Sequence, residues 1–174
     1  GEVPIPHQLL LAMDNFVDHD VATYRHSLIV FALTTFLMEL IQTDGSQAKN
    51  VLLVGPTHDL GKLFVPKSIL RQKTPLTRNE RALLEIHPIT GYVLSSYYLG
   101  DHQHPAAWVA LNHHERRDGS GYPRGHLESD LLVEMVAACD VYDALISSRP
   151  DRDGSYDNRS ALEELSSLAE TGVL

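Results

Sequence analysis

Two pairs of adjacent residues in this chain, one His-Asp and one His-His, have the chemistry to bind metal ions. The first pair is His58-Asp59, and the second is His113-His114, which runs directly into the glycine-rich segment 115–123. Imidazole nitrogen and carboxylate oxygen are ligands that zinc, manganese and iron share. A sequence that supplies both repeatedly can hold two ions around one bridging water, which is a centre suited to hydrolysis.

The candidate ligands stand on or at the ends of expected helices, and they are His26, His58, Asp59, His87, His113, His114 and Asp140. Helical bundles build metal sites from side chains that project inward from facing helices. Adjacent residues on a helix diverge by about 100°, so we expect each adjacent pair to straddle two ions, with Asp59 as the bridging carboxylate. Taken singly, each histidine is better explained as a core or surface residue, and only the joint pattern favours a binuclear site. Ordinary surface or loop positions are expected for His7, His19, His102, His104 and His126.

Composition indicates one globular domain that does not bind nucleic-acid polymers. The 174 residues are 43% hydrophobic, which is enough for a single core. The formal charge of −9 argues against a basic face for polymeric phosphate. A small anionic substrate remains compatible, because two divalent cations would outweigh the local charges of Asp59 and Asp140. The lone Cys139 excludes a disulfide framework, and we expect a reducing cytoplasm.

The spacing of apolar residues predicts an all-α fold, a helical bundle with a metal site in its core. Expected helices cover about residues 7–16, 20–43, 47–59, 78–99 with a break near His87-Pro88, 105–114, 130–147 and 159–170. Thr77 and Glu80 form a capping-box signature for the helix that begins at 78. The apolar run 28–40 is shorter than the ~20 residues that a bilayer span needs, so we expect a buried core helix and no membrane insertion.

One long connection, residues 115–129, leaves directly from the second histidine pair. It contains Gly119, Gly121, Pro123 and Gly125. Loops of that length in compact domains are more often functional than idle. We therefore expect this loop to take part in the site, against the alternative of a plain surface loop.

Ordered blocks along the chain resemble the HD-GYP subgroup of the HD phosphohydrolase superfamily, whose members are bacterial cyclic di-GMP phosphodiesterases. The blocks are Arg25-His26-Ser27, His58-Asp59-Leu60-Gly61-Lys62, His87-Pro88, segment 113–123, and Asp140-Val141-Tyr142-Asp143-Ala144-Leu145 with Arg149-Pro150. The resemblance covers about residues 20–170. It implies an HD-domain helical bundle over residues 20–174, preceded by a helical lead-in over residues 1–19.

The resemblance also implies roles for individual residues. His26, His58, Asp59 and Asp140 would surround one ion, and Asp59 would bridge to a second ion held by His87, His113 and His114. Lys62 matches a lysine that contacts the scissile phosphate, so Lys62 and Asp59 are the expected catalytic residues; the alternative for Lys62 is a solvated lysine at a helix end.

Substrate contacts are expected from Lys62, Tyr122, Arg149 and Arg152. Tyr122 would shape the mouth of the site, and the two arginines match basic residues that grip the substrate phosphates. Asp151 stands where the subgroup commonly has an aromatic residue. Glu115 and Asp118 are expected to order the loop or support ligands, and Tyr142 and Asp143 to pack and hydrogen-bond near Asp140.

One position departs from the members of the subgroup that hold a third metal ion. Those members use a glutamate one helical turn before the first histidine, and this chain has Ala22 there. Neither Asp18 nor Asp20 replaces it, because Asp18 lies a further turn away and Asp20 points off the His26 face. The resemblance therefore implies the two-metal version, which converts cyclic di-GMP to linear pGpG, with slow further hydrolysis to GMP left open.

The expected function is a metal-dependent phosphodiesterase that hydrolyses cyclic di-GMP through a hydroxide bridging two divalent ions, which are iron, manganese, nickel or zinc. Two alternatives stay open, a non-catalytic cyclic di-GMP receptor and a phosphohydrolase of another nucleotide. The first and last residues, Gly1 and Leu174, indicate a piece of a larger protein, so we expect a sensor or receiver domain as a partner. The oligomeric state is left open.

Overall fold

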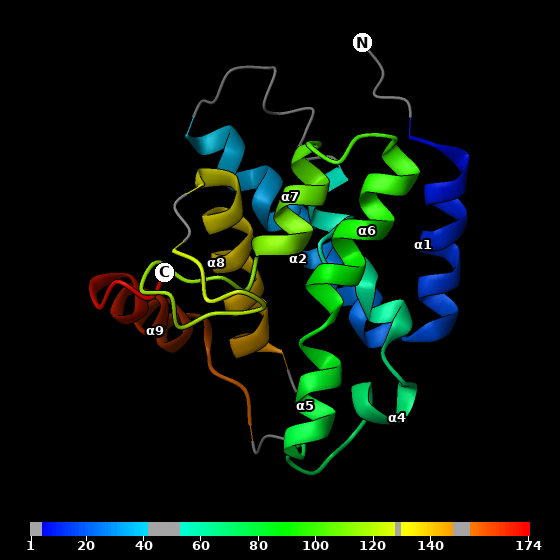
Figure 1. Cartoon of the computed structure of the whole chain (residues 1–174). Coiled ribbons are helices and arrows are strands. Elements are labelled where there is room, and N and C mark those ends of the chain that lie inside the picture. The colour runs from blue at the N-terminus through cyan, green and yellow to red at the C-terminus, as the bar shows by residue number, and fades with distance from the viewer. Residues whose placement is uncertain (1–4, 42–52, 128–129, 148–153) are drawn as a thin grey trace.

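The computed structural model describes residues 5–41, 53–127, 130–147 and 154–174 (Figure 1). Within these ranges every regular element is a helix, and the only extended pairing is an isolated bridge between Arg116 and Leu127. The predicted all-α class is therefore confirmed. The elements are α1 His7–His19, α2 Val21–Leu40, η1 Leu60–Phe64, α4 Lys67–Leu70, α5 Arg78–Leu84, α6 His87–Leu99, α7 Pro105–Asn112, α8 Leu131–Ile146 and α9 Asn158–Glu170.

Local sequence explains where several of these helices begin. The Asp20 side chain accepts a hydrogen bond from the Thr23 amide and caps α2. Thr77 and Glu80 form the predicted capping box at the start of α5. Pro88 lies in the first turn of α6, so the predicted break in the segment 78–99 is confirmed. Proline fits there because a first-turn amide has no helical partner to lose.

The segment around His58 differs from the expected helix 47–59. Residues 47–52 of that prediction lie outside the described residues, and helix is present at 53–57, with His58 and Asp59 in the turn that follows. The chain then forms the short helices η1 and α4, which were not predicted. Elements of four or five residues complete too few turns to produce a recognisable helical periodicity.

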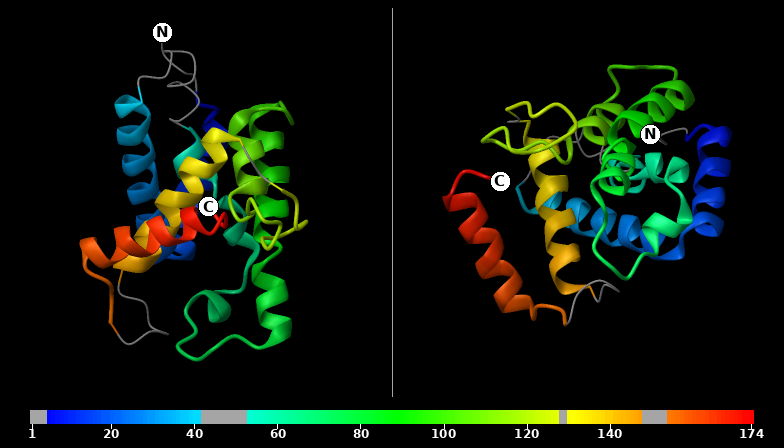
Figure 2. Two further views of the ribbon diagram at one scale, coloured as in Figure 1. Left: turned by 90° about the vertical axis from the view of Figure 1, so that its left-hand side faces the viewer. Right: turned by 60° about the horizontal axis from the view of Figure 1, so that its bottom comes forward.

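A core of aliphatic side chains joins the helices around the middle of the bundle. Its fully buried members include Leu9, Val30, Val54, Leu60, Val109, Val133 and Val136. α2 packs along α8, while α6 packs against both α7 and η1. α1 covers one side of this group, and α9 crosses the outer side of α8 (Figures 1 and 2). Leu9 places α1 in this core, while the proposed division of the chain at residue 19 stays a prediction.

Helix α2 is less buried than the sequence predicts. Its buried stripe is Ser27, Val30, Thr34 and Met38, whereas Phe36 and Leu40 are exposed. The buried positions recur every three or four residues, so within the described part of the chain they form a single face of α2. Among the described helices it is the one long and apolar enough to cross a membrane by length and composition, with 22% of the apolar window buried. These buried residues anchor α2 in the bundle, and α2 carries His26.

Candidate metal centre

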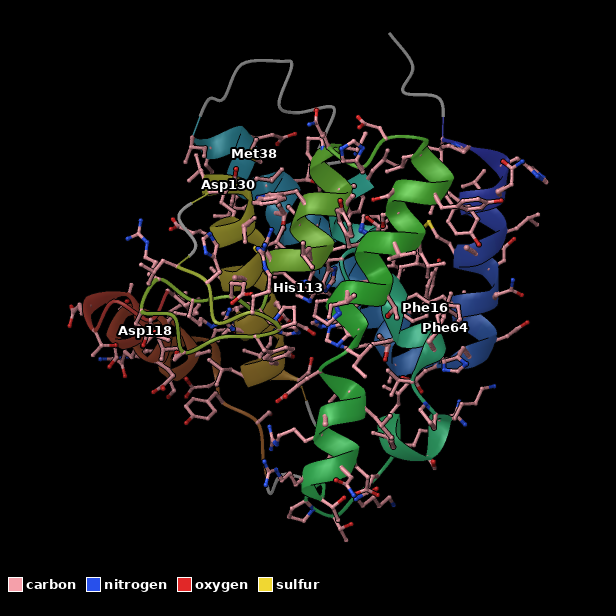
Figure 3. The ribbon with its side chains drawn as sticks, in the orientation of Figure 1. Phe16, Met38, Phe64, His113, Asp118 and Asp130 are labelled. Carbon is pink, nitrogen blue, oxygen red and sulfur yellow. The ribbon has the colours of Figure 1, made fainter. Side chains whose placement is uncertain are left out.

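All of the candidate ligands meet at one place inside the bundle. α2 contributes His26, the turn before η1 contributes His58 and Asp59, and α6 begins with His87. His113 and His114 follow the last turn of α7, and Asp140 lies on α8. Figure 3 shows His113 at the end of α7, between α8 and α6. The ligand atoms of these residues fall into two groups, and within each group they lie within 4.8 Å of one another.

The first group consists of Asp59, His87, His113 and His114. The Nε2 atoms of His87 and His113 lie 3.3 and 3.7 Å from Oδ1 of Asp59. The same two nitrogen atoms are 3.4 Å apart. Three imidazoles and one carboxylate oxygen thus converge on a common point, which is a donor set typical of divalent transition metals.

The second group consists of His26, His58 and Asp140. Nε2 of His26 lies 3.0 Å from Oδ1 of Asp140. The other oxygen of Asp59, Oδ2, lies 3.8 Å from Nε2 of His26 and 3.6 Å from Nε2 of His58. The two oxygens of Asp59 therefore face different groups, as a bridging carboxylate requires.

The histidine rings are oriented by hydrogen bonds at Nδ1. Three of them reach a carbonyl oxygen close by in the sequence: His58 to Gly55 at 2.6 Å, His87 to Leu84 at 2.7 Å, and His113 to Ala110 at 3.0 Å. A carbonyl oxygen can only accept, so Nδ1 carries the proton and the lone pair lies on Nε2. In each case it is this Nε2 atom that faces the cluster, which is how a metal-binding histidine is held.

Burial keeps several of these imidazoles neutral. It lowers the pKa of His58 to about 4 and also lowers the pKa of His87. The pKa of His114 is well below its usual value, because of burial and the neighbouring His113. A neutral imidazole is the form that binds a metal ion.

The two carboxylates, Asp59 and Asp140, stay charged although burial favours their neutral form. Burial raises the pKa of Asp59, but the positive charge of Lys62 is the largest of the effects that oppose it, and the net pKa lies well below the usual value. Burial likewise raises the pKa of Asp140, and the hydrogen bond from His26 reverses the shift. Both side chains are therefore charged at neutral pH, which is the form that coordinates a metal ion.

His26 behaves differently from the other ligands. Burial lowers its pKa, but hydrogen bonds to Asp140 and Asp143 outweigh burial and raise the pKa to about 9. A metal ion would have to replace the Nε2 proton of His26. Binding at this group should therefore release a proton.

Two buried polar atoms in the cluster support a cation as its missing partner. Nε2 of His58 and Oδ1 of Asp59 are fully buried and have no hydrogen-bond partner among the described residues. Leaving such atoms unpaired in the interior costs free energy. An ion held by His26, His58 and Asp140 would satisfy His58, and an ion held by the other group would satisfy Oδ1 of Asp59, so the residues present fit the expected metal.

Lys62 lies beside the bridging carboxylate rather than in solvent. Its Nζ atom donates to Oδ2 of Asp59 at 2.6 Å, and its side chain is 18% exposed. The alternative of a solvated lysine at a helix end is therefore wrong. Lys62 lies next to the cluster, where it could contact a bound phosphate. Its catalytic role stays a prediction.

The loop after His114 folds back over the cluster. The Tyr122 amide donates to the His114 carbonyl at 3.1 Å, and the Tyr122 ring stacks on the His114 ring with centroids 4.5 Å apart. A Cβ atom on Gly121 would lie 2.2 Å from the His114 carbonyl oxygen. The close return of the loop therefore requires glycine at 121, and it places Tyr122 at the edge of the site.

Glu115 holds this loop from within. Its carboxylate is buried and accepts hydrogen bonds from the backbone amides of Arg124 at 2.8 Å and His126 at 2.9 Å. Asp118 is exposed on the loop, where it accepts from the Ser120 amide (Figure 3). Both acidic residues therefore order the loop, as expected, and neither belongs to the ligand groups.

The remaining residues named from the sequence do not contribute to the described cluster or cannot be placed. Arg149, Asp151 and Arg152 lie outside the described residues, so their expected contacts stay predictions. Ala22 is exposed on α2, one turn before His26. The five other histidines belong to neither ligand group; one of them, His104, caps α7 by accepting from the Ala106 amide.

Two contributions to the site were not predicted as such. A Cβ atom on Gly61 would lie 1.9 Å from the His87 carbonyl oxygen, so glycine allows η1 to pack directly on α6. Asp143 bonds to His26 rather than merely lying near Asp140. The spacing of Asp140 and Asp143 was a usable signal, since residues three apart share one face of a helix.

Comparison with known proteins agrees with this geometry. A profile of the HD domain family matches residues 10–173. A cyclic di-GMP phosphodiesterase of Pseudomonas aeruginosa is 38% identical over 150 residues, which cover 83% of this chain and 35% of that protein. A 3'3'-cGAMP-specific phosphodiesterase of Vibrio cholerae is 34% identical over 147 residues, which cover 83% of this chain and 34% of that protein.

A solved structure supports the same fold. An HDG"Y"P protein from Bdellovibrio bacteriovorus superposes with a TM-score of 0.65 at 23% identity, covering 86% of this chain and 47% of that chain. The chain spans only about a third of the length of these two curated relatives. The match to the family profile extends over nearly the whole chain and includes every ligand of the cluster. This chain therefore belongs to the HD domain family.

Proposed function

We propose that this domain hydrolyses cyclic di-GMP to linear pGpG with two divalent metal ions. One observation carries the proposal: the two oxygens of Asp59 face two separate groups of ligands. Curated relatives named as cyclic di-GMP phosphodiesterases support the substrate, among them a response regulator of Xanthomonas campestris that is 40% identical over 106 residues, covering 60% of this chain and 28% of that protein.

The ligands divide between the two ions according to the groups. His26, His58 and Asp140 would hold one ion, and His87, His113 and His114 the other, with Asp59 shared between them. When bound, the ions supply Lewis acidity toward phosphoryl oxygens and lower the pKa of water to near neutrality. The donor set suits iron, manganese, nickel or zinc.

Lys62 contributes a positive charge close to the reacting phosphate. Its ammonium group lies against Asp59, within the same small volume as the ligands. Negative charge grows on the phosphoryl oxygens during phosphodiester cleavage, and a preorganised cation stabilises that charge. Lys62 is accordingly assigned to the transition state rather than to metal binding.

Tyr122 contributes a neutral hydrogen-bond donor at the mouth of the site. Burial, followed by the charges of Asp59 and Asp140, raises the pKa of its hydroxyl. The hydroxyl therefore keeps its proton at any pH at which the protein works. It can donate to a phosphate or ribose oxygen of the substrate, and it cannot act as a base.

The remaining substrate contacts are assigned to Arg149 and Arg152, whose guanidinium groups can pair with phosphate. The curated relatives that match are longer than this chain, which supports a sensor or receiver domain as a regulatory partner. The lone Cys139 is buried and unpaired, in keeping with a cytoplasmic protein.

A second candidate substrate is 3'3'-cGAMP. The Vibrio cholerae relative specific for that dinucleotide matches the same share of this chain as the Pseudomonas aeruginosa enzyme does. The two substrates differ in one base and share the sugar-phosphate ring that the metal centre would attack. The choice between them therefore depends on base contacts outside the metal ligands.

The test is a hydrolysis assay of the manganese-loaded chain with cyclic di-GMP, 3'3'-cGAMP or pGpG, followed by chromatographic separation of the products. We expect pGpG as the main product from cyclic di-GMP and no product from Asp59→Asn. Faster cleavage of 3'3'-cGAMP would replace cyclic di-GMP as the assigned substrate. Binding of either dinucleotide without any cleavage would instead support the receptor alternative and contradict the proposal.

A further inference from the structure

His26 is oriented in a different way from His58, His87 and His113. Nδ1 of His26 donates to a carboxylate oxygen, Oδ2 of Asp143, at 2.6 Å. The corresponding atoms of His58, His87 and His113 reach backbone carbonyl oxygens instead. The partner of His26 also comes from another helix, 117 residues away in the sequence.

The positions of the histidines explain this difference. His58, His87 and His113 each follow the end of a helical segment, where the last carbonyl groups have no helical amide to accept from. Those free carbonyls lie within reach of the rings. His26 lies inside the long helix α2, where the nearby carbonyls are committed to the helix itself. Its ring therefore needs an acceptor from outside α2.

Packing alone does not hold the His26 ring. Its side chain is 14% exposed, whereas those of His58, His87 and His113 are 0 to 1% exposed. A partly exposed imidazole can rotate about its side-chain bonds and present either nitrogen atom to the site. A fixed partner on Nδ1 removes that freedom and leaves Nε2 directed at the ligand group.

Asp143 is itself held in place. It is 2% exposed, and its second oxygen, Oδ1, accepts from the Ser147 hydroxyl at 3.0 Å. It lies one turn after Asp140 on α8, so the two carboxylates contact opposite nitrogens of the same ring. His26 is thereby clamped between two side chains of one helix.

From this arrangement we infer that Asp143 is a positioning residue for metal binding, which acts through His26 on one of the two ions. The carboxylate fixes the proton on Nδ1 and makes Nε2 a stronger electron donor, as partners of metal-binding histidines do. The other ion depends on His87 and His113, which backbone carbonyls hold, and on His114, whose ring stacks on Tyr122. Loss of Asp143 should therefore weaken one ion selectively. This inference rests on the proposed two-metal site and is independent of the substrate.

The experiment measures the dissociation constants of both manganese ions by calorimetric titration of metal-free protein, for wild type, Asp143→Asn, Asp143→Ala and Ser147→Ala. We expect Asp143→Ala to weaken one ion by about 10- to 100-fold and to leave the other unchanged. Asp143→Asn keeps an acceptor for Nδ1 but loses the charge, so its loss should be smaller. Ser147→Ala removes a contact that holds Asp143 but keeps the contact between Asp143 and His26, so it should weaken the ion less than either Asp143 variant.

A merely structural tie between α2 and α8 predicts a different result. In that case the Asp143 variants would lower the melting temperature of the metal-free protein, and both dissociation constants would match wild type. That outcome, or equal weakening of both ions, would overturn the inference while leaving the two-metal proposal intact. A wild type that binds fewer than two ions would overturn both. Asp143→Asn keeps the size and shape of the side chain, so the comparison holds if Asp143→Ala does not fold.

Discussion

At the scale of single residues, the site depends on how Asp59 is shared. Each of its oxygens faces different imidazoles, and it is the one ligand whose atoms contact both groups and Lys62. A carboxylate surrounded in this way is expected to stay charged and to link two cations. Lys62 balances that charge through its hydrogen bond to Oδ2. In the proposed site, bound ions would take over this balance and Lys62 would be available to contact the substrate.

The first prediction concerns Lys62. We expect Lys62→Ala to raise the barrier of the chemical step by about 2–4 kcal/mol, because a charge-stabilising donor is lost from the transition state. The corresponding fall in kcat is roughly 30- to 1000-fold. Steady-state kinetics with the metal content measured in parallel provides the check.

Lys67→Ala is the matched control, because Lys67 is exposed and donates only to the Asp18 carbonyl. Its kcat should equal that of wild type. If Lys62→Ala lost its metal ions, or kept full kcat with them bound, Lys62 would have no role in the transition state.

The second prediction concerns Ala22, which precedes His26 by one turn of α2 and is exposed. A glutamate there would project from the same face of the helix. We expect Ala22→Glu to bind a third ion and to shift the product from pGpG toward GMP. Elemental analysis and product separation would reveal both changes. Unchanged metal content and products in the folded variant would mean that other parts of the pocket set the number of ions.

At the scale of elements, two local structures position the ligands. The first is the start of α2, where Asp20 accepts from the Thr23 amide and pairs with Arg71 at 3.2 Å. The second is the loop after α7, which Glu115 holds from inside while Gly121 packs on the His114 carbonyl. The first fixes the helix that carries His26, and the second closes the site with Tyr122.

The third prediction tests the start of α2. Burial raises the pKa of Asp20, but the hydrogen bonds from Thr23 and the charge of Arg71 outweigh it, so the net pKa is lowered. A lowered pKa in the folded state means that the stabilisation is present above the unfolded pKa of 3.8 and is lost as the pH falls through the folded value. We expect Asp20→Ala to cost about 1 kcal/mol at pH 7, which is typical of a lost helix cap.

Urea unfolding of both proteins at neutral and at acid pH measures the effect. The difference between Asp20→Ala and wild type should shrink as the pH falls below the folded pKa of Asp20. Asp14→Ala, an exposed position on α1, makes the same chemical change and should have little effect. A difference that persisted unchanged into acid would mean that the charge of Asp20 does not contribute.

The fourth prediction tests the loop. The Cβ of Gly121→Ala would meet backbone atoms of His114 and Glu115, which cannot move aside without displacing the loop. We expect a large loss of phosphodiesterase activity with the helical content retained. Gly91→Ala is the control, because a Cβ atom there has its nearest neighbour at 3.4 Å, an ordinary contact. Full activity in Gly121→Ala would show that the placement of Tyr122 is not needed.

At the scale of the whole molecule, what the sequence could predict depends on how local each feature is. The long helices α2 and α8 followed from apolar spacing and end signals, and the break before His87 followed from Pro88. The short helices η1 and α4 did not, because they complete too few turns. Burial on only one side of α2 was also missed, since it depends on which neighbours pack there.

The sequence indicated the candidate metal ligands, but it did not indicate the hydrogen bond that orients His26. The candidate ligands were chosen by residue type and by their expected places on helices. Their division between two ions came from the resemblance to a known subgroup, since spacing alone would not have joined His26 to Asp140. The bond between His26 and Asp143 pairs two helices that are far apart in the chain. The spacing of Asp140 and Asp143 indicates that they share a face of α8, but it does not identify His26 as the partner of Asp143. Contacts of this kind are determined by the packing of the whole bundle.

The most direct test of the account is a manganese titration of metal-free protein in which hydrolysis of cyclic di-GMP is followed as the ions are added. The account predicts little activity at one equivalent and full activity at two, because the bridging position of Asp59 requires both ions. It also predicts pGpG as the accumulating product. Full activity at one equivalent, or no hydrolysis with two ions bound, would contradict a binuclear phosphodiesterase centre.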